Sequence, residues 1–173
     1  MRYIIIGLLI LITISCSPVK VTYDYDKEAN FNNYKTYNYY QDLETGLNTF
    51  DTKRLLTKLD EHLQSNGFSK SDTPDFFINI SSEDYQANSG TSVGVGMGGT
   101  SGNVGGGVSV GIPVGSSKLG RQIIFDFVDE NGKGLFWQAV SNSNYYPDAT
   151  PEEREASFEA IIIKVLEGYP PKK

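Results

Sequence analysis

Short stretches of alternating apolar and polar residues recur along this chain, and such alternation is typical of half-buried β-strands. In the first stretch Val19, Val21, Tyr23 and Tyr25 fall on one side of the predicted strand, and polar residues fall on the other. Further strands are predicted at the Tyr-rich residues 34–40, directly after Pro74-Asp75, at 121–129 and at 135–141. Asn131-Gly132 joins the last two stretches and is a strong signal for a hairpin turn.

Two other stretches have the spacing of apolar residues that lets a helix bury one face. The first helix is predicted to begin with Asp51 or Thr52 as its cap and to end at about Asn66. Gly67 then supplies the left-handed residue that commonly ends a helix. Four leucines at intervals of three and four residues form its apolar stripe: Leu55, Leu56, Leu59 and Leu63.

The second helix carries a nearly complete start signature. Thr150 is the predicted cap, Pro151 takes the first helical position, and Glu153 closes a capping box. Gly168 and Pro170 are predicted to end it. Its apolar face comprises Phe158, Ile161, Ile162 and Val165.

The elements follow the order β-β-α-β, then a glycine-rich region, then β-β-α. Hairpin-type links favour a mainly antiparallel sheet, and the single apolar face of each helix favours both helices packed on one face of it. The predicted class is therefore α+β, in a single domain over residues 21–170. A chain of 173 residues is long enough to bury such a core.

The chain begins with a segment typical of secreted proteins. Arg2 precedes an almost unbroken apolar run over residues 3–14, which matches a signal-peptide core and is shorter than a transmembrane helix. We expect residues 1–15 to be a signal peptide. The run ends at Cys16, and an ordinary signal peptide cut near a chance cysteine is the alternative. An unpaired thiol is a liability in an oxidising compartment, which favours lipidation of Cys16.

The end of this segment resembles the lipobox of bacterial lipoproteins, in which aliphatic and small residues precede a cysteine. The four positions here are Thr13, Ile14, Ser15 and Cys16, and Thr13 departs from the usual leucine. The resemblance implies cleavage before Cys16, acyl chains on that residue and a lipidated tether over residues 16–20. Neither an Asp nor an acidic run follows the cysteine. The resemblance therefore favours the periplasmic face of the outer membrane.

The composition excludes several classes of protein. There are 15 Lys+Arg against 21 Asp+Glu, for a formal net charge of -6, which disfavours a nucleic-acid partner because phosphate binding needs clustered cations. A single Cys excludes an internal disulfide framework. One Cys with one His also excludes the usual zinc sites. We expect no metal and no cofactor.

Glycine is concentrated in one part of the chain. Eleven of the 18 glycines lie within residues 90–115, which contain no charged side chain. Apolar residues alternate with small ones there, which predicts a Gly-rich β-hairpin insert of weak register. Gly94, Gly96 and Gly99 match a dinucleotide-binding spacing, but no helix is predicted to follow, so we expect no nucleotide. A membrane-inserting hairpin of an oligomeric pore is a sharper alternative, although it lacks interfacial aromatic residues.

No arrangement of catalytic residues is evident in the sequence. His62 is the only imidazole, and nothing marks a nucleophile that would converge on it, so we predict a solvated or boundary histidine and no catalytic residue. Asp24 and Asp26 would share a strand face that could host a cation. Protection of a sheet edge by charge explains these two carboxylates more simply.

The clearest candidate for a binding surface is aromatic. Tyr23, Tyr25, Tyr37 and Tyr39 lie in the first two predicted strands, and exposed rings could stack on a sugar or on a partner's side chains. The alternative is that these rings fill a half-buried sheet.

Two phrases near the N-terminus resemble a known family. Residues 21–26 read VTYDYD and residues 30–37 read NFNNYKTY, which is similar to the opening of domain of unknown function 4136, an uncharacterised family of bacterial lipoproteins. The helix end at Gly67-Phe68, the Gly-rich middle and a hairpin carrying Trp137 also resemble that family. Ala139 stands where the family often has Gly. The resemblance spans about residues 19–169 and implies location and fold, but no activity.

Two classes of function are consistent with these observations. The first is a lipid-anchored, non-catalytic envelope protein that contacts the membrane through acylated Cys16 and binds an envelope protein or a glycan. The second is an oligomeric pore-forming or small-ligand-binding lipoprotein that uses the Gly-rich hairpin. Neither class is an enzyme, and neither binds nucleic acid.

Overall fold

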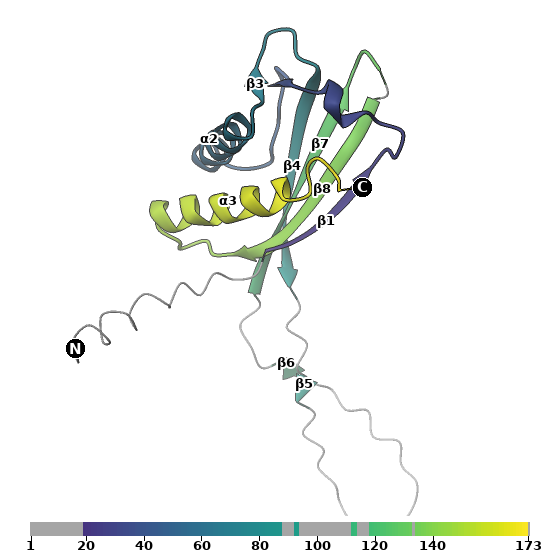
Figure 1. Cartoon of the computed structure of the whole chain (residues 1–173). Coiled ribbons are helices and arrows are strands. Elements are labelled where there is room, and N and C mark those ends of the chain that lie inside the picture. Colours follow the sequence, from purple (N-terminus) through teal and green to yellow (C-terminus); the bar gives the residue numbers. More distant parts are fainter. Residues whose placement is uncertain (1–18, 88–91, 94–111, 114–117, 133, 173) are drawn as a thin grey trace, which may run out of the picture.

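The computed structural model describes residues 19–87, 92–93, 112–113, 118–132 and 134–172. Six strands form one sheet in the order β1-β8-β7-β4-β2-β3. Two long helices, α2 (Thr49–Ser65) and α3 (Pro151–Leu166), cover one face of that sheet (Figure 1). The strands are β1 (Lys20–Tyr25), β2 (Thr36–Tyr39), β3 (Ser69–Lys70), β4 (Phe76–Ala87), β7 (Lys118–Asp129) and β8 (Gly134–Tyr145).

The sheet is mixed, which corrects the prediction of a mainly antiparallel one. Ladders β1–β8, β8–β7 and β7–β4 are antiparallel, but β2 runs parallel to both β4 and β3. The reason is the connection between these strands. Helix α2 carries the chain from β2 back across the sheet, and such a crossover returns the next strand in the same direction. The links from β4 to β7 and from β7 to β8 join antiparallel neighbours, whereas β1 and β2 are consecutive in the chain but have three strands between them.

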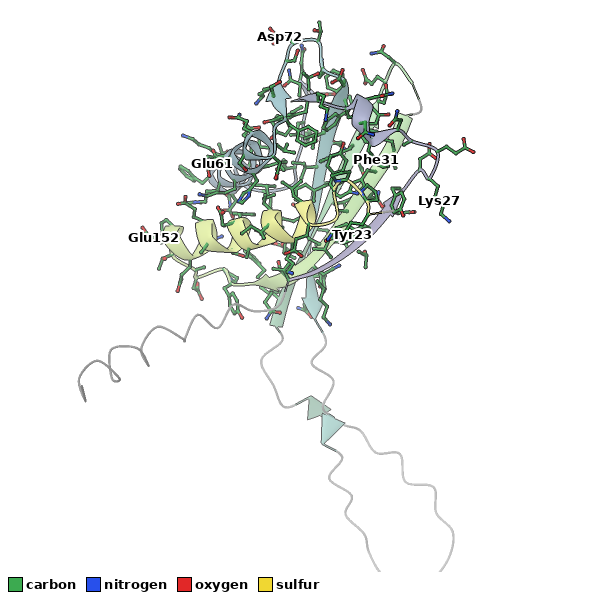
Figure 2. All side chains as sticks on the ribbon, in the orientation of Figure 1. Tyr23, Lys27, Phe31, Glu61, Asp72 and Glu152 are labelled. Atoms are coloured by element: carbon green, nitrogen blue, oxygen red, sulfur yellow. The ribbon has the colours of Figure 1, made fainter. Side chains whose placement is uncertain are left out.

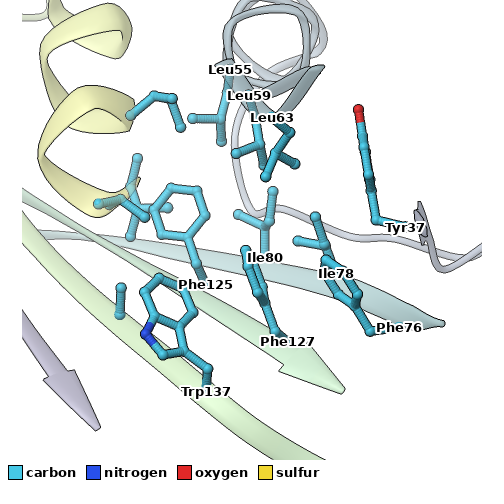
Figure 3. Packing of buried hydrophobic residues seen from close by; sticks show 14 of the residues in the cluster. Tyr37, Leu55, Leu59, Leu63, Phe76, Ile78, Ile80, Phe125, Phe127 and Trp137 are labelled. Carbon is cyan, nitrogen blue, oxygen red and sulfur yellow. The ribbon is translucent and has the colours of Figure 1, made fainter. Parts of the chain in front are cut away.

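The core lies between the sheet and the two helices (Figure 3). Alternate residues of β4 and β7 point toward the helices and are fully buried, among them Ile78, Ile80 and Phe125. Leu55, Leu59 and Leu63 of α2 meet them, together with the predicted apolar face of α3. Each large apolar side chain that is buried contributes about 1.5–3 kcal/mol, so this interface is the main source of stability.

The start of each helix is fixed by a side-chain cap. The capping box at Thr150 and Glu153 is confirmed, with reciprocal bonds of 3.2 and 2.8 Å. The predicted cap of α2 is wrong, because Asn48 accepts the backbone N–H of Asp51 at 3.0 Å and the helix begins at Thr49. Asparagine suits this position as well as Asp or Thr does, and Nδ2 of Asn48 also donates to Oδ2 of Asp51 at 2.9 Å.

The hairpin of β7 and β8 is longer than predicted and contains an irregularity. Phe127 pairs with Trp137, whereas Val128 pairs with Leu135, so Phe136 is an extra residue on β8. A bulge of this kind breaks the strict alternation of faces. Phe136 and Trp137 are consequently both fully buried, although they are neighbours in sequence. Phe136 stacks on Tyr34 with ring centroids 4.0 Å apart.

Several predictions fall outside the described residues. These include the signal peptide at 1–15, the lipidated Cys16 and most of the Gly-rich hairpin at 90–115. Within that region the structure describes only β5 (Ser92–Val93) and β6 (Ile112–Pro113), which pair antiparallel as a separate two-stranded sheet. Among the helices in the described ranges, none combines the length and the apolar character needed to span a membrane.

Asp75 joins the beginnings of β2 and β4. Its carboxylate accepts the backbone N–H groups of Lys35 and Thr36, each at 2.8 Å, and its own N–H is donated to the Thr36 hydroxyl at 2.9 Å. Burial alone would raise the pKa of Asp75, but these N–H donors outweigh that effect and hold the pKa below its ordinary value. The ionised carboxylate therefore stabilises the folded state.

We predict that Asp75→Asn lowers the free energy of unfolding by about 1 kcal/mol at neutral pH. A depressed pKa in the folded state means that the contribution is present above the unfolded pKa, about 3.9, and is lost as the pH falls through the folded value. The difference between wild type and Asp75→Asn should accordingly shrink below pH 4, as measured by urea unfolding across pH. Asp72→Asn is the matched control, because Asp72 points into solvent in the same loop (Figure 2). Equal pH profiles for the two variants would contradict this account.

Candidate functional site

A buried carboxylate with several arginines around it lies where both helices begin. Asp51 is only 1% exposed. Its Oδ1 is 3.0 Å from Nη1 of Arg54, and its Oδ2 is 3.1 Å from Nη1 of Arg154 and 3.6 Å from Nη1 of Arg121. The three arginines come from α2, α3 and β7, so one carboxylate holds three elements together. We call Asp51, Arg54, Arg121 and Arg154 the arginine cluster.

The Arg121 guanidinium contacts two carboxylates and one aromatic ring. Its Nε and Nη2 donate to the two carboxylate oxygens of Asp84, at 2.6 and 2.9 Å. Its guanidinium carbon lies 3.7 Å from the ring centre of Tyr145, which is a close cation–π contact. Burial alone would lower the pKa of Arg121, but the bonds to Asp84 outweigh it and raise the pKa. Arg121 therefore remains charged.

Arg154 fixes the loop between β8 and α3. Nε donates to the carbonyl of Ala149 at 3.1 Å, and Nη2 donates to the carbonyl of Pro147. Nη1 is taken by Asp51. All three nitrogens of this guanidinium thus have acceptors within the protein. A charged side chain bound in this way stabilises its loop, and its positive charge is already paired with Asp51.

An open groove of about 660 Å³ lies beside the arginine cluster. Its walls come from the end of β8, the following loop, one side of α3 and the start of the described chain at Val19. Much of the lining is apolar, including Tyr145, Tyr146, Ala156 and Phe158. A groove of this size is within the range of small-molecule sites. We call it the terminal groove.

The terminal groove lies at one particular end of the sheet. Lys20, the first residue of β1, pairs with Asn142, which pairs in turn with Gln122. Beyond this row β8 continues to Tyr145, while β4 and β7 continue to the residues that flank the glycine region. The beginning of β1, the end of β4 and the beginning of β7 therefore share one end of the sheet (Figure 1). The groove lies at the same end, because Val19 and Tyr145 line it.

The four tyrosines predicted as a binding surface are separated into two pairs. Tyr23 and Tyr25 lie on β1, at one edge of the sheet, whereas Tyr37 and Tyr39 lie on β2, with three strands between the pairs. Tyr37 is fully buried, and its hydroxyl and that of Tyr39 both donate to Asp60 at 2.8 Å. Burial and the Asp60 carboxylate raise the pKa of both phenols.

The first pair keeps part of its surface accessible. Tyr23 and Tyr25 are each 39% exposed. The hydroxyl of Tyr23 donates to the carbonyl of Lys164 near the end of α3, and its ring lies so close to Gly168 that a Cβ there would clash. Tyr25 packs edge-on against Phe31. Both tyrosines thus pack the edge strand β1 against the rest of the domain and still keep part of their surface accessible.

His62 connects the two helices. Its Nε2 lies 2.6 Å from Oε1 of Glu159, and Lys58 on the same helix contacts Glu61, Glu155 and Glu159 at 3.1–3.2 Å. The bond to His62, followed by those to Lys58, holds the pKa of Glu159 below its ordinary value. These contacts give His62 a role in helix packing. Among the described residues, no group of three or more His, Cys, Asp or Glu side chains is placed to hold a metal ion.

The arginine cluster was missed in the sequence, although one signal for it was present. Asp51 precedes Leu55, Leu59 and Leu63 at intervals of four, so it continues the stripe that faces the core. An acidic residue on such a stripe must be paired when it is buried. No local pattern identifies the partners, because Arg121 and Arg154 are distant in sequence.

Comparisons with known proteins find one family and one fold. The family described as "Domain of unknown function (DUF4136)" matches residues 21–171. No curated protein matches the chain. A PDZ domain protein from Parabacteroides distasonis is similar in structure, with a TM-score of 0.58 and 14% identity over 91% of this chain. This chain spans 36% of that protein's length.

A second similar structure is the PelC dodecamer from Paraburkholderia phytofirmans. Two PelC structures, one of them a variant with a single substitution, give TM-scores of 0.52 and 0.51, with 9% identity over 90% of this chain and 100% of theirs. At such low identities, both likenesses show a shared fold and nothing further about activity.

We predict that Asp51→Asn costs about 3–5 kcal/mol in the free energy of unfolding, because three arginines lose the buried carboxylate that they share. Asp84→Asn is the matched control. The Asp84 side chain is 42% exposed, so its loss should cost only about 1 kcal/mol. Urea unfolding at neutral pH measures both values. If the two variants are equally stable, the buried carboxylate does not have the central role assigned to it.

Proposed function

The chain belongs to the family of the domain of unknown function DUF4136, and we propose that it is a lipid-anchored, non-catalytic binding or structural module of the cell envelope. In this proposal residues 1–15 are a signal peptide, Cys16 carries acyl chains, and the domain stands on the periplasmic face of the outer membrane. A Gly-rich hairpin over residues 90–115 extends from the end nearest the membrane.

The observation that carries this proposal is the common end shared by the beginning of β1, the terminal groove, the end of β4 and the beginning of β7. Cys16 is four residues before Lys20, where β1 begins. Four residues of fully extended chain reach at most roughly 14 Å. A lipid on Cys16 would therefore hold this end of the sheet next to the bilayer and direct the opposite end away from it. The lipid on Cys16 would thus both anchor the domain to the membrane and set its orientation.

The chemistry of the described residues supports a non-catalytic role. The cationic groups nearest the groove are engaged with Asp51, Asp84 and backbone carbonyls. His62 is engaged with Glu159 at 2.6 Å. Polar groups bound in this way stabilise a scaffold rather than act on a substrate.

The surface offered to a partner would be the face of the sheet that α2 and α3 leave open (Figure 1). Ile124, Asp126 and Gln138 alternate with core residues on β7 and β8 and are half-buried. Tyr40 stacks on Phe77 with ring centroids 5.0 Å apart on the same side of the sheet. A mixture of aromatic, apolar and hydrogen-bonding groups suits an envelope protein or a glycan.

The second candidate is an oligomeric pore or ligand-binding assembly. It is favoured by the edge strand β1, most of which is exposed, and by the direction of β1, which is opposite to that of β3 at the other edge. Antiparallel pairing of β1 in one copy with β3 in the next would keep every copy in the same orientation, with every Cys16 on one side. The PelC structures of similar fold are described as dodecamers.

We predict that the N-terminal tryptic peptide of the mature protein, residues 16–20, carries acyl chains when its mass is measured. Cys16→Ala should remove the acyl chains and release the protein from salt-washed membranes, because no other anchor is proposed. Ser17→Ala is the matched control and should remain bound. A Cys16→Ala protein that stays in the salt-washed membrane fraction, or an unmodified wild-type peptide, would refute the lipid anchor.

We expect the chain solubilised in detergent to have the mass of one copy per micelle, measured by light scattering with correction for detergent. A ring mass would favour the second candidate instead. Val21→Pro distinguishes a genuine edge-paired ring from aggregation, because proline removes an N–H from the exposed edge of β1. A ring that is built through this edge should dissociate in the variant.

A further inference from the structure

We propose that the terminal groove holds one acyl chain of the lipid on Cys16 of the same molecule. This inference rests on the proposed function, because it requires Cys16 to be acylated. It goes further in assigning a ligand-binding site, a ligand class and an intramolecular source for the ligand.

The lining of the groove suits a hydrocarbon chain. The apolar part of the lining comes from α3 and from the end of β8. The charged residues of the lining lie toward the start of α3 and on β7. The apolar residues are Ala156, Phe158, Ala160, Ile161 and Tyr145, and the charged ones are Arg121, Asp148, Glu153 and Arg154. Ala156 is exposed and Ala160 is half-buried, so apolar surface remains in contact with water along α3. An acyl chain lying in the groove would cover this surface, and burial of apolar area is favourable without any directional contact.

The arginines beside the groove do not make it an anion site. Arg121 donates to both oxygens of Asp84, and Arg154 donates to Asp51 and to two backbone carbonyls. A carboxylate or phosphate would compete with Asp51 and Asp84 for these guanidinium groups. The groove therefore favours the apolar part of a lipid over its headgroup.

The position of the groove identifies the lipid on Cys16 as the source of the acyl chain. Val19 lines the groove and lies three residues after Cys16, so the lipidated cysteine is within roughly 11 Å of the groove even when the tether is extended. An acyl chain attached to Cys16 at this distance has an effective concentration in the millimolar range at the groove. Its binding is therefore favoured over that of lipids that are not attached.

Moving an acyl chain from the bilayer into the groove exchanges one apolar environment for another and costs little. Covering the apolar part of the groove removes its surface from water, which is favourable. An anchor with several chains would keep the remaining ones in the bilayer, and two are enough for stable attachment. The groove would then hold the domain close to the membrane surface in a fixed orientation.

The test uses the full-length protein produced in cells fed a fatty acid with a photoreactive diazirine near its end. After irradiation of intact cells, tryptic peptides of the purified protein are analysed by mass spectrometry. Cleavage after Lys20, Arg154 and Lys164 releases residues 16–20 and residues 155–164 as separate peptides. We expect these two peptides to be joined through the acyl chain.

Variants show whether the groove itself is responsible. Ala156→Trp and Ala160→Trp would each fill the groove and should reduce the joined peptide to background. Ile163→Trp is the matched control, since Ile163 is on the same helix, is 42% exposed and is not part of the groove lining. It should leave the joined peptide unchanged. If one alanine variant does not fold, the other variant and the wild-type adduct still test the proposal.

Two results would overturn the inference. One is acylated residues 16–20 without any adduct on residues 155–164, and the other is an adduct made by a free phospholipid instead of the anchor. Both leave the proposed function intact, because the acylation is read directly from the mass of residues 16–20. If that peptide carries no acyl chain, the proposed function fails together with the inference.

Discussion

The pairing of the buried Asp51 carboxylate with three arginines is the interaction that fixes how the helices and the sheet are placed. The Asp51 carboxylate is almost completely buried, and it forms ion pairs with guanidinium groups from α2, β7 and α3. It also lies in the first turn of α2, where the helix dipole favours a negative charge. A buried charge is costly unless it is paired, so each of these elements is confined to the position that supplies a partner. The two helices consequently begin at the same end of the sheet.

This arrangement determines the character of the neighbouring groove. The guanidinium groups of Arg121 and Arg154 are paired with protein carboxylates and carbonyls, and Arg154 holds the carbonyls of Pro147 and Ala149 in the loop that forms one wall. Both arginines line the groove, and their positive charges are already paired within the protein. The remaining apolar lining fits a ligand that is recognised by its hydrocarbon surface. The proposed lipid anchor supplies such a ligand next to Val19.

Patterns in the sequence predicted the elements that depend on contacts between residues close together in the chain. The capping box at Thr150 and Glu153 and the Asn131-Gly132 hairpin both depend on contacts between residues close in sequence. Non-local features were not predicted. The parallel ladders of β2 depend on where α2 returns the chain, and the burial of Phe136 beside Trp137 depends on a bulge opposite Phe127 and Val128. The four candidate tyrosines are close in sequence, but β1 and β2 are separated by three strands of the sheet.

The sequence by itself determined the two helices, most of the strands, the α+β class and the family resemblance, because apolar periodicity and capping chemistry are properties of short segments. It also supplied Cys16 as the candidate anchor. Only the tertiary structure decided which strands are neighbours, that one buried aspartate meets three arginines, and that the terminal groove lies beside the start of β1. These facts depend on contacts between residues such as Asp51 and Arg154, which are 103 positions apart. No short pattern encodes such a contact, since it arises only when the whole chain packs around one core.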